Sequence, residues 1–506
     1  MINIFQNLRK EALQFMPKNN IIAILKENYT ARNTSKEYTE TMSILQPYLQ
    51  RMDPGRFTKV SAAKTITLQV TEDCNLACTY CYQINKSPAK MSFETAKKFI
   101  DLILSDDKTK NSYINRDNAD IVILDFIGGE PLLEIDLIDN VVDYFLKRCI
   151  ELDHPWMYGY MLSIGSNGTL YQTPKVQRFL EKHLNRLSLN ITVDGDKELH
   201  DSCRVFHDGT GSYDLASFAA TDWMKRTNGA SKSTKITIAP GNVKHLKNAL
   251  INMIDLGFNH INENCVYEDV WNSELAHELF VQLIGIADYI VDNDLETKIS
   301  LRIFDPSSYV LVDPYNNENW CGGNASMLAC DPNGDLFNCV RYMKSSLGED
   351  IEPLVIGNVD LGIGTTDLYK ENIKKMSCVN RRSQSTDKCY WCPIGQGCGW
   401  CSAYNYQYYG TVNKRTETTC QMHTASSLAS NYYWNRVLEK HGYEERLRLT
   451  TPRDWALEIV SEKEYEDIRK SAKSLPFESK EWYESHVKPV RINPDNTISI
   501  IEDTSV

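Results

Sequence analysis

The chain has 506 residues, of which 42% are hydrophobic and 24% charged. This composition excludes wholesale disorder and predicts two or three globular domains. The net charge of −12 argues against a nucleic-acid partner. There is no secretory signal and no apolar stretch of membrane-spanning length, so we expect a cytoplasmic protein without membrane contact.

Taken in chain order, the sequence predicts four parts. Residues 1–60 predict a mainly helical N-terminal extension. Residues 61–305 alternate short β-branched runs with amphipathic segments, which predicts an α/β fold with a parallel sheet, open or barrel-like. Residues 306–430 are rich in Gly, Asn and Cys and predict a loop-rich domain held by metal, and residues 431–506 predict a helical tail. The expected strands are 66–70, 121–127, 161–165, 187–193, 235–239 and 261–267.

The fifteen cysteines are unevenly distributed. Three lie within residues 74–81 and nine between residues 321 and 420. A large cytoplasmic chain does not need disulfides, so clustered cysteines indicate metal or redox chemistry.

The first cysteine group follows the first predicted strand, in the segment TEDCNLACTYCYQ. Cys74, Cys78 and Cys81 have the spacing C-x3-C-x2-C. Three thiolates can hold a four-iron cluster and leave one iron open to a small chelating molecule. Zinc is the alternative, although zinc sites usually combine C-x2-C pairs.

Polar residues and glycines follow the next three predicted strands. Ligands bind at the carboxyl ends of the strands in parallel α/β sheets, and glycines let a ligand approach the backbone closely. An arginine at this edge can form a fork onto a carboxylate. We interpret His200 as structural. The candidate ligand-binding residues are Gly128, Gly129, Glu130, Pro131, Ser166, Asn167, Asp194 and Arg204.

The second cysteine region has the pattern C-x12-G-x4-C, then C-x2-C-x5-C-x2-C, then a final cysteine. Metal ligation is the expected source of stability for such loops, and structural zinc is the alternative to an iron–sulfur cluster. We expect Cys330 to be a buried small hydrophobe and leave the role of Cys378 open. We expect Cys149, Cys203 and Cys265 to be buried. The candidate metal ligands are Cys321, Cys339, Cys389, Cys392, Cys398, Cys401 and Cys420.

The first group and the GGEP segment together resemble the radical S-adenosylmethionine (SAM) superfamily. Its motif is C-x3-C-x-Φ-C with an aromatic residue at Φ, here Tyr80, and its GGE motif follows the second strand. The resemblance covers about residues 62–305 and implies a partial (β/α)6 barrel. It also implies that Cys74, Cys78 and Cys81 ligate a [4Fe–4S] cluster whose fourth iron is chelated by SAM. One electron then cleaves SAM to a 5′-deoxyadenosyl radical that abstracts a substrate hydrogen.

The second region resembles the SPASM domain of peptide-modifying radical SAM enzymes. The chain departs from that pattern by having two residues rather than three before Cys401, which puts the geometry at Cys401 in doubt. The resemblance implies two auxiliary [4Fe–4S] clusters. Cys321, Cys339 and Cys401 would serve the first, and the second would be served by Cys389, Cys392, Cys398 and Cys420. Cys330 and Cys378 are the candidates for an eighth ligand.

Several segments, among them DFIGGEPLLE and RRSQSTDKCYWCPIGQGCGWCSAYNYQ, are similar to maturases of peptides with CXXX repeats. This similarity implies an enzyme that installs a modification in a ribosomally made precursor peptide, with a thioether crosslink from cysteine as the leading hypothesis. It also implies a one-electron reductant such as flavodoxin or ferredoxin. The alternatives are an anaerobic sulfatase-type maturase that forms formylglycine, and a zinc-stabilised binding protein without catalysis.

Overall fold

The computed structural model describes residues 63–471 with internal gaps, together with short strands near both ends of the chain. No helix in these ranges is long and apolar enough to cross a membrane. The internal gaps are 108, 110–120, 228–231, 268–270, 306–307, 310, 313–315, 318–320, 322, 324–326, 400 and 442–448.

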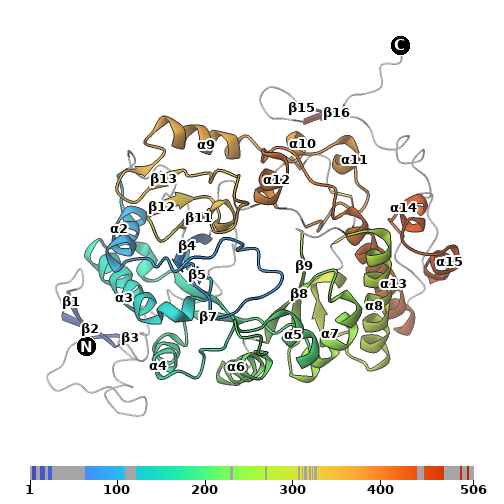
Figure 1. Cartoon of the computed structure of the whole chain (residues 1–506), viewed down its shortest axis with the longest axis horizontal. Coiled ribbons are helices and arrows are strands. Elements are labelled where there is room, and N and C mark those ends of the chain that lie inside the picture. The colour runs from blue at the N-terminus through green and yellow to red at the C-terminus, as the bar shows by residue number, and fades with distance from the viewer. Residues whose placement is uncertain are drawn as a thin grey trace.

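All six strands expected between residues 61 and 305 are present, and each is followed by helix (Figure 1). Their β-branched and apolar residues favour extended backbone buried against helices. The strands are β4 (Ala63–Thr71), β5 (Ile121–Gly128), β6 (Tyr160–Ser166), β7 (Leu187–Ile191), β8 (Ser233–Ile238) and β9 (His260–Cys265), with a short β10 (Ser300–Leu301). The helices are α2 (Phe93–Leu104), α3 (Ile135–Glu151), α4 (Pro174–His183), α5 (Lys197–Cys203), α6 (Tyr213–Arg226), α7 (Leu246–Asp255) and α8 (Ser273–Asp292).

The strands pair in parallel but form two sheets. One has the order β4-β5-β6-β7, and the other has the order β10-β9-β8. Figure 1 shows the helices on the outer side of this curved row of strands. The expected α/β architecture is therefore present, with its hydrogen bonding interrupted between β7 and β8.

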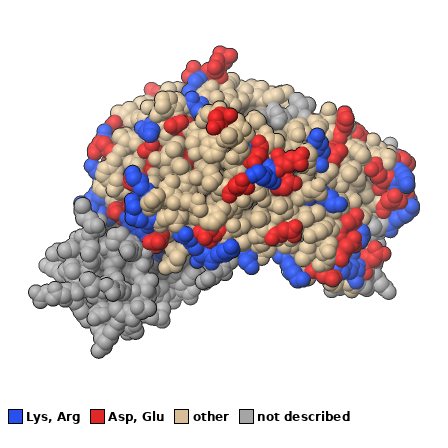
Figure 2. All heavy atoms as spheres, turned by 60° about the horizontal axis from the view of Figure 1, so that its bottom comes forward, with Lys and Arg blue, Asp and Glu red and all other residues tan. Residues whose placement is uncertain are grey.

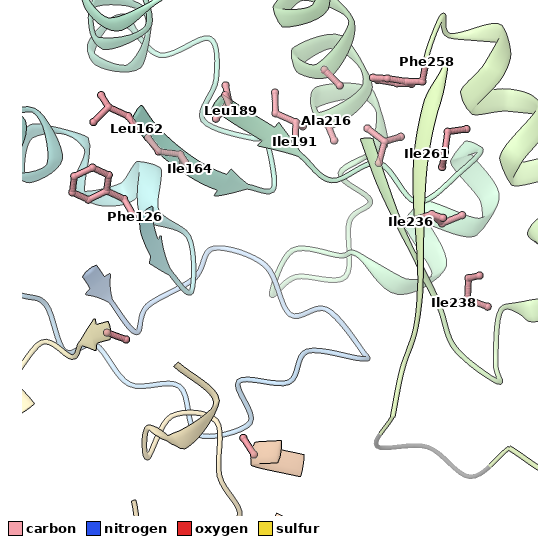
Figure 3. Packing of buried hydrophobic residues seen from close by; sticks show 14 of the residues in the cluster. Phe126, Leu162, Ile164, Leu189, Ile191, Ala216, Ile236, Ile238, Phe258 and Ile261 are labelled. Atoms are coloured by element: carbon pink, nitrogen blue, oxygen red, sulfur yellow. The ribbon is translucent and has the colours of Figure 1, made fainter. Parts of the chain in front are cut away.

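Alternating residues of each strand form the hydrophobic core between sheet and helices. Phe126, Leu162 and Ile164 point to this side from β5 and β6, and Ile236 and Ile261 do so from β8 and β9 (Figure 3). All five are at most 1% exposed. The opposite, inner side of the strands is left to polar residues such as Asp125, which accepts a hydrogen bond from Thr67 of β4.

The cysteine-rich region adds four short strands to the same sheet. β11 pairs with β4 in parallel, in register from Met327 with Thr65 to Cys330 with Leu68. β4 therefore lies inside an eight-stranded sheet that crosses the expected boundary at residues 305/306. The added strands are β11 (Met327–Cys330), β12 (Asp335–Phe337), β13 (Gly357–Asn358) and β14 (Gly362–Ile363), and the helices of this region are α9 (Asp367–Ser377), α10 (Arg381–Gln384), α11 (Asp387–Tyr390) and α12 (Ser402–Tyr409).

Both ends of the chain differ from expectation. The described residues before 63 form an antiparallel sheet, because runs such as IIAI combine β-branched residues at a length typical of strands. The rest of the expected helical extension, residues 25–60, lies outside the described residues and stays a prediction. At the other end α13 (Cys420–Lys440) runs through the expected boundary at 430/431 and packs on α8, where Arg436 pairs with Asp288 at 2.5 Å. The terminal elements are β1 (Asn3–Gln6), β2 (Ala12–Met16), β3 (Ile21–Ile24), α14 (Arg453–Leu457), α15 (Glu462–Ser471), β15 (Val490–Ile492) and β16 (Ile498–Ile500).

Positive and negative side chains alternate over the face of the molecule drawn in Figure 2. No broad area of one sign is visible on that face.

Candidate functional site

The first cysteine group lies on the loop that follows β4. This loop is anchored to the segment after α5 by backbone hydrogen bonds, from the Ala77 amide to the Val205 carbonyl (2.8 Å) and from the Thr79 amide to the Cys203 carbonyl (3.0 Å). The His207 ring donates from Nε2 to the carbonyl of Cys74 at 2.9 Å. The three thiols are therefore presented by a loop whose backbone is fixed on one side by residues 203–207.

Gly128 and Gly129 hold the same loop from the other side. The Gly129 amide donates to the Thr71 carbonyl (3.1 Å), and the Glu130 amide donates to the Asp73 carbonyl (2.9 Å). A Cβ atom on Gly129 would lie 2.3 Å from the Asp73 carbonyl oxygen and 2.7 Å from the Cys74 Cβ. In this structure the glycines allow the close approach of the cysteine loop, where the sequence predicts the close approach of a ligand.

We expect Gly129→Ala to lower iron binding and to destabilise the protein by about 1–3 kcal/mol, because the new methyl group must displace the Asp73–Cys74 backbone. Iron content and a urea unfolding curve measure the two effects. Gly241→Ala is the matched control, since a Cβ there meets no atom within 4 Å. Equal behaviour of the two variants would contradict the prediction.

Glu130 is buried, with 1% of its surface exposed, and its carboxylate holds several neighbouring groups by hydrogen bonds. Its carboxylate accepts hydrogen bonds from the Ser166 hydroxyl (2.8 Å), the Asn167 amide (2.8 Å) and the Leu132 amide (3.1 Å). Burial raises the pKa of this carboxyl, and these hydrogen bonds oppose that rise. Glu130 and Ser166 thus bind one another, and both join the carboxyl ends of β5 and β6.

Asn167 also reaches the cysteine loop. Its side-chain amide donates to the Asn75 side chain at 2.9 Å, and Asn75 donates to the Thr169 hydroxyl at 2.8 Å. The structure therefore connects the predicted residues Glu130, Ser166 and Asn167 to the loop that carries Cys74 and Cys78.

Asp194 and Arg204 meet the first cysteine group through Tyr80. The Tyr80 hydroxyl donates to the Asp194 carboxylate and accepts from Arg204 Nη1 at 2.9 Å. Arg204 Nη1 also lies 3.8 Å from the Asp194 carboxylate. Burial raises the pKa of Asp194, and the Arg204 charge opposes this rise. Within the described residues Arg204 Nε is buried without a hydrogen-bond partner.

His200 has the structural role expected for it. Its Nδ1 accepts from the Asp194 amide (3.1 Å), while its Nε2 lies 3.0 Å from the Ser212 hydroxyl. Because that hydroxyl donates to the Arg204 carbonyl at 2.7 Å, it accepts from a protonated Nε2. Burial, with the charge of Arg204, lowers the pKa of His200 to about 3. The ring is therefore a neutral link that positions Asp194 and Arg204.

All fifteen cysteines lie in the described part of the chain, and none of them forms a disulfide there. Electrostatic interactions among the thiols divide the ten candidate ligands into three groups. We name these the core group, the first auxiliary group and the second auxiliary group. The core group is Cys74, Cys78 and Cys81. The first auxiliary group is Cys321, Cys339 and Cys401. The second auxiliary group is Cys389, Cys392, Cys398 and Cys420.

Groups of three or four thiols are the donor set that an iron–sulfur cofactor would require. Burial raises the pKa of Cys74 and Cys78, and it raises the pKa of Cys339, Cys392 and Cys420 to about 12. These thiols are protonated without metal, so iron binding must release protons. In the described ranges no three His, Cys, Asp or Glu side chains are close enough to hold a single metal ion.

The second auxiliary group lines a pocket. Arg415, His423 and Trp455 also line this pocket, and Lys388 Nζ lies 5.1 Å from the centroid of the Trp455 ring of α14. A residue that follows α13 therefore contributes to the same pocket as these thiols.

The remaining five cysteines differ in their burial. Cys149 and Cys330 are fully buried, and Cys203 is 8% exposed, as the sequence predicts, whereas Cys265 is half-buried. Cys378 is exposed at the end of α9, where its thiol lies 3.4 Å from the Lys375 carbonyl. The prediction of an eighth ligand stays open.

One part of the chain matches a family of known proteins. Residues 65–205 match the family described as the 4Fe-4S single cluster domain. The fold is that of anSMEcpe, solved with bound AdoMet and the Cp18Cys peptide, with a TM-score of 0.53 and 16% identity over 75% of this chain and 99% of that one.

Two curated relatives are similar to this chain over different lengths. Mycofactocin maturase MftC of Mycobacterium tuberculosis is 23% identical over 76% of this chain and 90% of its own length. The serine-type anaerobic sulfatase-maturating enzyme of Bacteroides thetaiotaomicron is 30% identical over 28% of this chain. The chain spans less than half the length of two of the curated relatives that it matches, 46% of an uncharacterized protein of Methanocaldococcus jannaschii and 31% of the serine-type enzyme. The resemblance to radical SAM peptide maturases that the motifs indicate is confirmed by these matches.

Proposed function

We propose that this chain is a radical SAM enzyme that abstracts a hydrogen from a ribosomally made precursor peptide and installs a thioether crosslink from cysteine. The observation that carries the proposal is the set of three thiol groups in one chain. One lies inside the matched 4Fe–4S segment, and two lie beyond it. Residues 61–305 would form the radical SAM core, and residues 306–430 a SPASM domain with two auxiliary clusters.

The core-group thiolates would hold the cluster, and the residues around them would orient SAM. When bound, cluster and SAM together supply a 5′-deoxyadenosyl radical. The buried Arg204 Nε, which has no hydrogen-bond partner in the described residues, offers a donor to a carboxylate. Asp194 and Tyr80 fix this guanidinium, while Glu130, Ser166 and Asn167 hold the loop ends in place.

Iron analysis tests the cofactors. We expect about twelve irons per chain after anaerobic purification, three clusters of four, and a brown, oxygen-sensitive protein. A colourless, air-stable protein with zinc would instead support a zinc-stabilised binding protein. About four irons with zinc would keep the core site and make the C-terminal region a structural zinc domain.

Mass spectrometry tests the reaction. We expect a co-expressed, cysteine-containing precursor peptide to lose two hydrogens for each crosslink formed. The relative MftC is named a maturase, and anSMEcpe was solved with a peptide, which supports a peptide substrate. An unchanged peptide mass in the presence of SAM and a one-electron reductant such as flavodoxin would count against the proposal.

A second candidate is favoured by the sulfatase-maturating relative, which is 30% identical in the matched segment. In this case the product is an aldehyde, formylglycine, formed from Cys or Ser. A sulfatase-motif peptide assayed with an aldehyde-reactive hydrazide separates the two candidates, because a thioether does not react with that reagent.

A further inference from the structure

Two residues link the core group to the first auxiliary group. Tyr82 directly follows Cys81, and Arg341 lies two residues after Cys339, in a single 3₁₀ turn (Val340–Tyr342). The Arg341 guanidinium lies over the Tyr82 ring, 4.8 Å from its centroid. The contact joins residues that are far apart in the sequence and adjacent to ligands of two different groups.

The backbone around this contact is held firmly. Asn85 donates to the carbonyls of Lys344 (3.2 Å) and Leu347 (2.7 Å), and its own amide donates to the Ser345 carbonyl at 3.1 Å. The buried Gln69 side chain of β4 donates to the Ser345 hydroxyl at 3.1 Å. These bonds fix segment 82–85 against segment 344–347, so the position of Arg341 is determined by both parts of the chain.

The charge of Arg341 acts on the first auxiliary group. Electrostatic interactions connect it to Cys339 and Cys401, and the Tyr82 hydroxyl interacts with both Cys81 and Cys339. A [4Fe–4S] cluster gains one negative charge on reduction. A fixed cation beside it therefore stabilises the reduced form and raises its reduction potential.

We propose that Arg341, held over the Tyr82 ring, is a positioning residue that raises the reduction potential of the first auxiliary cluster. This inference rests on the proposed cluster at Cys321, Cys339 and Cys401. Arg341 would tune this reduction potential without ligating the cluster. The reduction potential would then depend on how the loop after Cys81 packs against the turn after Cys339.

The test is an electron paramagnetic resonance redox titration of the full chain loaded with iron and sulfide. We expect Arg341→Gln to shift the oxidised-to-reduced ratio of one cluster about tenfold toward the oxidised form, which is 59 mV for one electron. Titrations with and without SAM identify the core cluster, since SAM chelates only that cluster. Arg341→Lys should retain most of the wild-type potential.

Lys344→Gln is the matched control, because this exposed lysine is three residues away and donates from Nζ to the Glu349 carbonyl. Equal shifts in both variants, or no shift in a fully loaded Arg341→Gln protein, would overturn the inference. Should that variant bind less iron, Tyr82→Leu replaces it, with a smaller shift in the same direction expected; no shift there also overturns the inference. A wild-type chain with only about four irons would instead contradict the proposed auxiliary clusters themselves.

Discussion

Replacing Cys78 with alanine is expected to abolish SAM cleavage and to remove about four irons per chain. Cys78 lies in the middle of the core group, where Arg204, Cys74 and Cys81 are its electrostatic neighbours. Removing its thiolate leaves two ligands, too few to hold a four-iron cluster on this loop. The measurements are the iron content and the yield of 5′-deoxyadenosine with SAM and dithionite.

Two control variants separate this effect from a general loss of cysteine. Cys149→Ala removes a buried thiol of α3 that is not among the candidate ligands, and its iron content should equal that of the wild-type chain. Cys392→Ala should lose about four irons from the second auxiliary group while it still cleaves SAM. Normal 5′-deoxyadenosine formation by Cys78→Ala would sink the assignment of the core group.

Replacing Glu130 with alanine is expected to lower the free energy of unfolding by about 3–5 kcal/mol. Three donors lose their shared acceptor, and the hydroxyl of Ser166 and the amides of Asn167 and Leu132 stay buried. Because β5, β6 and the cysteine loop meet at this carboxylate, the variant should also bind less iron. Urea unfolding of the anaerobically purified protein measures the first effect.

Glu134 provides the matched control for Glu130. It also follows β5 in the sequence, but it pairs with Lys90 at the surface, where the Lys90 side chain is 53% and the Glu134 side chain 19% exposed. An exposed ion pair contributes at most about 1 kcal/mol. A Glu134→Gln variant as unstable as Glu130→Ala would show that the network at Glu130 is not the cause.

The parts of the fold that were predictable depend on local patterns. The strands from β4 to β9 carry dense β-branched runs, and the core group is recognisable by its spacing and by the GGEP segment. The contact of His207 with Cys74, the pair of Tyr82 and Arg341, and the register of β11 on β4 were not predictable, because they join segments that only tertiary folding brings together. Of these residues, His207 was the one that lies close in sequence to a predicted site residue, three positions after Arg204.

The pairing of β11 with β4 has a consequence for protein engineering. A fragment that ends at residue 305 leaves β4 with a bare edge over Thr65–Leu68, because its neighbour there comes from residues 327–330. Such an uncovered edge recruits strands from other molecules and promotes aggregation. Chimeras that exchange the cysteine-rich region between homologous chains must therefore take β4 and β11 from the same parent chain.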